Sequence, residues 1–167
     1  EMVIRMTDKQ GVKITKIEGQ DLPLDVKRNV AGVAAQAMLA KHPANCGFEI
    51  EIYKKIKAGS GIGSSAASAA GAVFGINELL GKPYNTHDLI QFAMEGESVA
   101  SGSAHADNVA PVLLGGFTLV RSINPVDVIK LPSPSELMAV VLHPKIELKT
   151  MHAREILKNN VTLKKAI

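Results

Sequence analysis

Three short stretches in the first third of the chain carry the residue pattern of strands. Val3–Thr7 and Val12–Ile17 are rich in β-branched residues, and the polar turn Asp8–Gly11 separates them. They are predicted to form a hairpin or to lie as two neighbouring strands. In Phe48–Tyr53 apolar residues alternate with glutamate, which predicts a strand with one face buried and the other exposed to solvent.

Other stretches change to helical periodicity. The pattern predicts helices over Asn29–Ala40, over Ser64–Leu80 and from a cap at Asn85 or Thr86 to about Ala100. The rest is predicted to hold an apolar segment, three strands and two helices, namely Val109–Leu114, then Phe117–Arg121, Val126–Leu131 and Leu137–Leu142, then Thr150–Lys158 and a helix from Val161. Because helices and strands mix without regular alternation, the predicted fold class is α+β.

Composition and charge argue against several classes of protein. The chain has 167 residues, of which 46% are hydrophobic and 21% charged, and its formal net charge of +3 includes no long Lys/Arg run. We therefore expect no nucleic-acid partner. The longest weakly polar stretch, Ala66–Ile76, is too short and too rich in small residues to cross a membrane. Cys46 is the only cysteine, which favours a reducing compartment and predicts a cytoplasmic location.

The segment Ala58–Ser65 is a Gly/Ser-rich loop that runs directly into a predicted helix. Glycines let the backbone adopt positive φ and let a ligand approach bare N–H groups. The first turn of the helix adds unpaired N–H donors and a partial positive charge, so the segment is predicted to bind phosphate. The hydroxyls of Ser64 and Ser65 add donors, and either is a candidate ligand of Mg²⁺.

Two standard glycine loops and a ligand-free hinge are the alternatives. A Walker A loop needs a lysine before its final Ser or Thr, and here Ser64 follows Gly63 directly. Gly61–Ala66 formally matches the dinucleotide-binding pattern G-x-G-x-x-[GA], but the strand before it alternates with glutamate, and the acid at the right distance, Glu78, falls within a helix. A hinge without a ligand rarely leads into a long Ala-rich helix.

Two glutamates in the helix after Thr86 fall on different faces. Glu97 lies on the flank of the apolar stripe, whereas Glu95 lies on the polar side. A carboxylate on a packed flank has to be paired, hydrogen-bonded or bound to a cation. With a phosphate site nearby, Mg²⁺ ligation is the specific hypothesis for Glu97, and a salt bridge to Lys or Arg is the alternative.

A second polar cluster, Ser101–Asn108, lies between apolar segments. Polar residues grouped where the chain enters the core often line a site. Asp107 is a candidate to bind a substrate ammonium group or to accept a proton. His105 could do either, although a lone histidine is more often structural.

The two clusters together resemble a known family. Gly59–Ser68 looks like the second motif of the GHMP kinases, a superfamily of small-molecule kinases. Within it, His105–Pro111 and Leu114–Thr118 resemble the homoserine kinases. The resemblance extends from about Asn29 to Arg154. It implies an α+β domain of the GHMP N-terminal type, with a mixed or antiparallel sheet packed with helices, and incomplete at both ends.

The resemblance also divides the chain. Residues 1–131 would form the ATP-binding N-terminal domain without its first strands, and residues 132–167 would begin the C-terminal domain. The family's first motif and its third, glycine-rich motif are not found in this sequence. Both contribute substrate or phosphate contacts, so the chain alone is not expected to be a competent kinase.

The resemblance assigns the family's functional residues to matching positions of this sequence. The resemblance implies ATP contacts at Asn29, Val30, Lys54, Gly59, Ser60, Gly61, Ile62, Gly63, Ser64 and Ser65. Asn29 and Val30 would contact the adenine, and Lys54 would flank that pocket. Mg²⁺ would be held by Ser65 and Glu97. Substrate contacts would come from His105, Asp107, Asn108 and Arg154, and the catalytic set would be Asp107, Thr150 and Arg154.

The implied reaction is transfer of the ATP γ-phosphoryl group to the side-chain hydroxyl of L-homoserine, in threonine biosynthesis. The alternatives are another GHMP kinase, acting on mevalonate or a sugar, a non-catalytic nucleotide-binding module, and the dinucleotide-dependent oxidoreductase already weighed. A dedicated general base and a homodimer are both left open.

Overall fold

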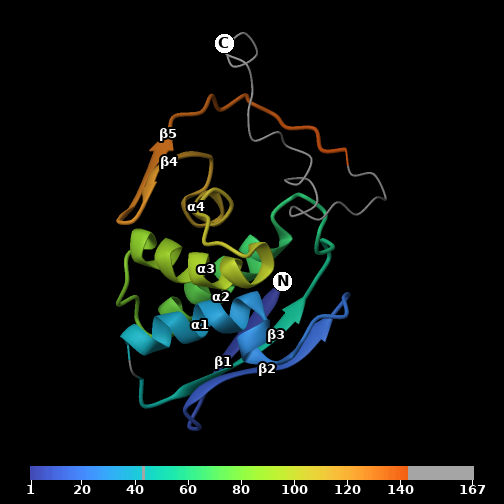
Figure 1. Ribbon diagram of the computed structural model, residues 1–167, viewed down its shortest axis with the longest axis vertical. Coiled ribbons are helices and arrows are strands. Elements are labelled where there is room, and N and C mark those ends of the chain that lie inside the picture. Colours follow the sequence, from blue (N-terminus) through green and yellow to red (C-terminus); the bar gives the residue numbers. More distant parts are fainter. Residues whose placement is uncertain (43, 143–167) are drawn as a thin grey trace.

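The computed structural model describes residues 1–42 and 44–142, which form a layered arrangement of helices and strands (Figure 1). Its elements in chain order are β1 (Met2–Thr7), β2 (Gly11–Glu18), the 3-10 turn η1 (Val26–Arg28), α1 (Val30–Lys41), β3 (Gly47–Tyr53), α2 (Ser64–Leu79), α3 (Thr86–Ser101), α4 (Val109–Leu114), β4 (Phe117–Ile123) and β5 (Val126–Leu131). The α+β class is confirmed. The helices predicted at Thr150–Lys158 and from Val161 lie outside the described residues.

The first sheet has the order β1-β3-β2 and is mixed, because β3 is antiparallel to β1 and parallel to β2. The predicted pairing of the first two strands is therefore wrong, since β3 lies between them. The side chains of β3 explain its central place: Phe48, Ile50 and Ile52 are all buried. Gly47 lets the β1–β2 turn pass over the start of β3, since a Cβ there would overlap Lys9 O.

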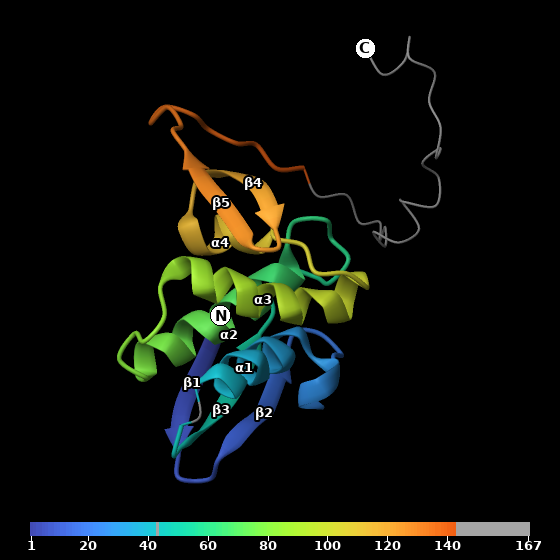
Figure 2. The ribbon, with the colours of Figure 1, turned by 60° about the vertical axis from the view of Figure 1, so that its left-hand side comes forward.

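Helices cover one face of this sheet in two layers. Helices α1 and α2 lie against the strands, and α3 packs on both of them from the far side (Figure 2). The helices approach closely because the contact is built from alanine and glycine. A Cβ at Gly96 of α3 would overlap Val30 O and would lie 2.9 Å from Ala34 Cβ. The Ala-rich part of the core is thus concentrated between α1, α2 and α3.

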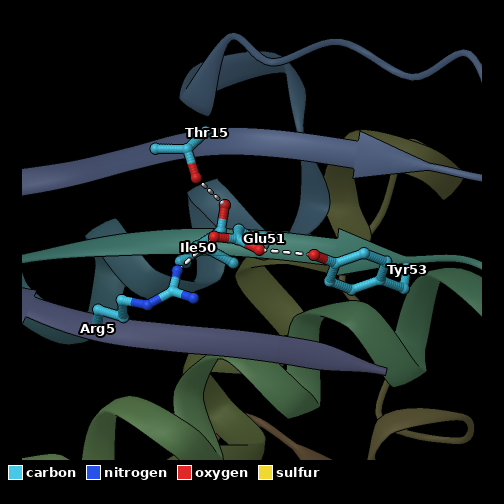
Figure 3. A network of polar contacts seen from close by, with 5 residues as sticks. All are labelled: Arg5, Thr15, Ile50, Glu51 and Tyr53. Atoms are coloured by element: carbon cyan, nitrogen blue, oxygen red, sulfur yellow. Dashed lines mark hydrogen bonds and ion pairs between the residues drawn. The ribbon is translucent and has the colours of Figure 1, made fainter.

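The other face of the sheet carries a polar network (Figure 3). Arg5 of β1 pairs with Glu51 of β3, and the Tyr53 hydroxyl donates to Glu51 Oε2 at 2.6 Å. Thr15 Oγ1 of β2 donates to Ile50 O at 3.3 Å. The alternation of apolar residues with glutamate in β3 therefore predicted the two faces correctly.

A second sheet, the antiparallel hairpin β4–β5, packs on α3 and α4. His87 in the first turn of α3 lies with Nε2 2.9 Å from Val128 O of β5. The strand predicted at Leu137–Leu142 is wrong, because this run is irregular and exposed, with Val140 90% accessible. A segment forms a β-strand only when a neighbouring strand pairs with it, and no strand lies beside Leu137–Leu142 in the described part of the chain. No helix among the described elements has the length and apolar character needed to span a membrane.

Candidate phosphate-binding site

The glycine-rich loop joins the end of β3 to the start of α2. Its last residue, Gly63, is the N-cap of α2 with φ 76°, so the helix begins without a side-chain cap. The N–H groups of the first turn therefore remain available to an anion. Gly61, with φ 77°, has open space where a Cβ would stand. The loop thus presents bare backbone beside a helix N-terminus, the arrangement that the sequence predicted.

Hydroxyl groups of the loop extend this arrangement. Ser60 Oγ is buried and has no hydrogen-bond partner within the described part of the chain, which leaves it able to bond a ligand. Ser64, 6% exposed, donates through Oγ to Ile56 O at 2.8 Å. Its hydroxyl is thereby used to fix the start of the loop, whereas the partly exposed Ser65 lines the cavity that is also lined by Asn29 and Val30. Of the two candidate hydroxyl ligands, Ser65 is therefore better placed.

Lys54 reaches from the end of β3 to the first turn of α2. Its Nζ donates to Ser64 O at 2.6 Å and to Ser68 Oγ at 2.7 Å. Burial lowers the pKa of the Lys54 ammonium, and the negative charge of Glu97 opposes that shift by raising it. The ammonium is thus fixed beneath the loop, with an acidic residue of α3 close enough to influence it.

Glu97 and Glu95 lie as the helical pattern predicted. Glu97 is 6% exposed, whereas Glu95 is on the exposed side of α3. The salt-bridge alternative for Glu97 has a physical basis, since its charge acts on Lys54. Across residues 1–42 and 44–142, no three His, Cys, Asp or Glu side chains gather in a way that could hold a metal ion. A cation here would depend on further oxygen ligands, such as phosphates.

A cavity of about 210 Å³ lies beside the loop and brings several predicted residues together. It is lined by Asn29, Val30, Lys54 and Ser65, together with Leu22, Pro23, Arg28, Ile52, Ala58, Ser68, Val99 and Ala100. The Asn29 side chain is already used in shaping this wall. It accepts from Ala31 N at 3.0 Å as the cap of α1 and donates to Pro23 O at 3.0 Å. A larger hollow, about 440 Å³, shares Ile52, Lys54 and Ser68 with this cavity.

The second polar cluster lies next to the exit of the loop. Figures 1 and 2 both show the turn after α3 beside the segment that follows β3. A Cβ at Gly63 would lie 4.0 Å from Asn108 Oδ1. Asp107 and Asn108 are exposed, and His105 Nε2 lies 2.7 Å from Ser103 Oγ. The structure therefore brings Asn108 to the loop, and Asp107 precedes it directly in the chain, while Thr150 and Arg154 lie outside the described residues.

One residue of this region was missed by sequence reasoning. Gln20, just after β2, donates through Nε2 to Ile56 O at 2.7 Å and accepts at Oε1 from Ala58 N at 2.8 Å. A single glutamine in a polar connection carries no sequence pattern that would mark it. Its role depends on a contact between segments 36 and 38 residues apart in the chain.

Comparison with known proteins places these features in a family. Residues 28–116 match the family described as GHMP kinases N terminal domain. A homoserine kinase of Chlorobium phaeobacteroides (strain BS1) is 45% identical over 163 residues, covering 93% of this chain and 51% of the relative. A homoserine kinase of Methanococcus vannielii is 43% identical over 169 residues, covering 99% and 55%. The chain thus spans about half the length of the curated relatives it matches.

Solved structures agree. The crystal structure of a homoserine kinase from Cytophaga hutchinsonii is 48% identical in sequence and superposes with a TM-score of 0.92, over 99% of this chain and 53% of the other. A mevalonate kinase of L. major in complex with R-mevalonate superposes with a TM-score of 0.55 at 21% identity, over 74% of this chain and 40% of the other. At that identity the second likeness shows the shared fold alone.

Proposed function

The chain belongs to the GHMP kinase family, and we propose that it is the ATP-binding part of a homoserine kinase. The proposed reaction transfers the γ-phosphoryl group of ATP to the side-chain hydroxyl of L-homoserine. The observation that carries the proposal is the open glycine loop leading into the uncapped first turn of α2, beside Lys54 and Glu97. The similarity to homoserine kinases supports the choice of acceptor.

The loop and α2 would hold the triphosphate of ATP. Backbone N–H groups at a helix N-terminus bind phosphate oxygens without the cost of ordering long side chains. Ser60 Oγ is a further donor, because it is buried without a partner among the described residues. The cavity lined by Asn29 and Val30 would take the adenine. Phosphoryl transfer requires positioning and charge neutralisation more than covalent chemistry, and the loop together with Mg²⁺ would supply both.

Mg²⁺ fits the donors that the structure offers. Ser65 lines the cavity beside Lys54, and the Glu97 carboxylate acts on the same lysine. A hydroxyl and a carboxylate are hard oxygen donors, and Mg²⁺ usually combines one or two carboxylates with substrate phosphates. We propose that Ser65 and Glu97 hold it. When bound, Mg²⁺ neutralises charge on the phosphate oxygens.

The polar cluster after α3 would hold the acceptor. Asp107 is exposed next to the loop exit, where a carboxylate can pair with the ammonium group of homoserine. His105 and Asn108 are proposed to line the same side. Arg154 would bind the substrate carboxylate and Thr150 would lie near the γ-phosphate, as the family pattern implies. We assign Asp107 to substrate binding rather than to removal of the hydroxyl proton.

Two further properties are proposed. The protein is expected in the cytoplasm, since its single cysteine suits a reducing compartment. Residues 132–167 are proposed to begin the second domain of the longer kinase.

The test is an acceptor assay with the full-length protein, Mg²⁺ and γ-labelled ATP. L-homoserine, mevalonate and galactose are compared as acceptors, and L-homoserine is expected to receive the label with the highest kcat/KM. Preferential labelling of mevalonate or galactose would assign the protein to another branch of the family. ATP binding without transfer to any acceptor would favour a nucleotide-binding module instead.

A further inference from the structure

We infer that Gln20 is a positioning residue for the nucleotide site, because its side-chain amide holds the start of the glycine loop in the shape that receives phosphate. The inference rests on the proposed function, since it concerns the same loop. Gln20 itself lies outside the Gly/Ser-rich segment and belongs to the connection between β2 and η1. It acts through the loop backbone rather than by touching the reacting atoms.

The contact uses both ends of the amide. Nε2 donates to Ile56 O at 2.7 Å, and Oε1 accepts from Ala58 N at 2.8 Å. The partners are a carbonyl and an N–H group, so only this orientation of the amide satisfies both. Ile56 O also accepts from Ser64 Oγ at 2.8 Å. This one carbonyl therefore joins the end of β2, the start of the loop and the start of α2.

The amide of Gln20 continues the pairing of β2 with β3 beyond the ends of the strands. The register runs to Glu18 and Tyr53, and Lys54 N then donates to Glu18 O at 2.8 Å. At Gly19 a Cβ would overlap Lys54 O, so the two segments lie in direct contact. Gln20 is the residue after Gly19, and its side-chain amide, rather than its backbone, bonds the facing segment at Ile56 and Ala58. Two residues at the start of the loop, Ile56 and Ala58, are thereby fixed to the sheet.

Fixing the loop matters because the loop has little else to hold it. Residues 55–59, 61 and 62 are exposed, and Gly61 meets no atom within 4 Å of a Cβ position. Each backbone residue that a ligand must order costs conformational entropy, so a loop fixed before binding gains affinity. The two hydrogen bonds of Gln20 remove part of that cost in advance.

Gln20 also connects the loop with the opposite wall of the 210 Å³ cavity. Leu22 and Pro23, two and three residues after Gln20, line that cavity, and Ala58 lines it from the loop side. Asn29 Nδ2 donates to Pro23 O, which joins the same connection to the cap of α1. The distance between the loop and the proposed adenine wall is therefore set through Gln20.

The test compares Gln20→Met with Gln36→Met in the full-length protein. Methionine keeps the length of the side chain and loses both hydrogen bonds, and Gln36 provides a matched site on the exposed face of α1. Gln20→Met is expected to speed hydrogen exchange of residues 55–63 in the absence of nucleotide. It should also raise the Kd and KM for ATP roughly tenfold. This is the effect expected when part of the free energy of two ordinary hydrogen bonds is lost from ATP binding. The kcat, the KM for L-homoserine and the thermal midpoint should stay at the values of Gln36→Met.

Unchanged exchange in the loop would overturn the contact itself. Faster exchange with unchanged ATP affinity would overturn the positioning role, as would an equal loss in kcat. A wild-type protein that binds ATP but labels none of the acceptors would refute the proposed reaction, and the exchange and affinity measurements would still decide the role of Gln20. A wild-type protein that does not bind ATP would overturn both.

Discussion

Glycine has opposite roles in two regions of this molecule. Between α1, α2 and α3 it allows close packing, since a Cβ at Gly96 would overlap Val30 O and would lie 3.1 Å from Ala69 Cβ. In the loop after β3, Gly61 has φ 77° and open space around it. The first region needs a residue without a side chain for folding, and the second needs one for backbone shape and ligand access. Substitutions in the two regions should therefore separate stability from nucleotide binding.

The largest effect is expected from Gly96→Ala. The added methyl group would meet backbone and helix side chains that cannot move far, so overpacking should lower the free energy of unfolding by about 3 kcal/mol. Urea denaturation measures this. The control is Gly71→Ala in α2, where the new Cβ would meet only Met2 atoms at 3.8 and 3.9 Å. Alanine in a helix interior is preferred to glycine, so the control should be as stable as wild type or more so. Equal stability of the two variants would contradict the close-packing account.

Glu97 follows Gly96 directly and joins the packed region to the loop. Glu97→Gln should reduce kcat/KM for Mg·ATP by roughly 100-fold, the order of loss when a charge-stabilising group is removed from a reacting site. Glu95→Gln changes the exposed side of the same helix and should leave kcat/KM within about twofold of wild type. Steady-state kinetics at varied Mg²⁺ concentration measures kcat/KM for both variants. Similar behaviour of both variants would mean that the burial of Glu97 serves structure alone.

Gly61→Ala tests the open region. A non-glycine residue at positive φ costs about 1–2 kcal/mol, and the exposed loop can relax to avoid that cost. The free energy of unfolding should then stay near the wild-type value, while the Kd for ATP measured by calorimetry rises roughly tenfold. A variant that loses stability but keeps its affinity would reverse the distinction between the two regions.

The smallest effect is expected on the outer face of the sheet, away from both regions. The hydrogen bonds from Tyr53 and Arg5 lower the pKa of Glu51. A carboxyl with a lowered pKa in the folded state stabilises the protein above its unfolded pKa, and the contribution disappears as pH falls through the folded pKa. Wild type should thus be slightly more stable than Glu51→Gln at pH 7, and the difference should shrink as pH falls below the ordinary glutamate pKa and through the lowered folded pKa. Urea denaturation across pH checks this, and a difference that does not depend on pH would contradict it.

Local patterns predicted much of the fold and the centre of the candidate site. The alternation in Phe48–Tyr53, the helix start at Ser64 and the buried face that holds Glu97 each depend on neighbours within a few residues. A glycine-rich loop entering a helix is likewise a local feature, and its open backbone is present in the structure.

The failures involve partners far away in the chain. The sequence carries no direct sign that β3 inserts between β1 and β2, because strand order depends on pairings between segments far apart in the chain. Leu137–Leu142 carries strand residues but has no neighbour to pair with among the described residues. Val109–Leu114 was recognised only as apolar, although it forms α4. Gln20 acts on residues 36 and 38 positions later, which no local pattern could indicate.

Phosphate is proposed to bind where the glycine loop meets α2, and this can be followed in two-dimensional NMR spectra through the backbone amide signals while ATP is added. The largest shifts are predicted at Gly61, Gly63, Ser64 and Ser65, with the amide of Gly96 in the packed region changing little. Shifts concentrated elsewhere, for example in β4–β5, with these loop amides unchanged, would contradict the account.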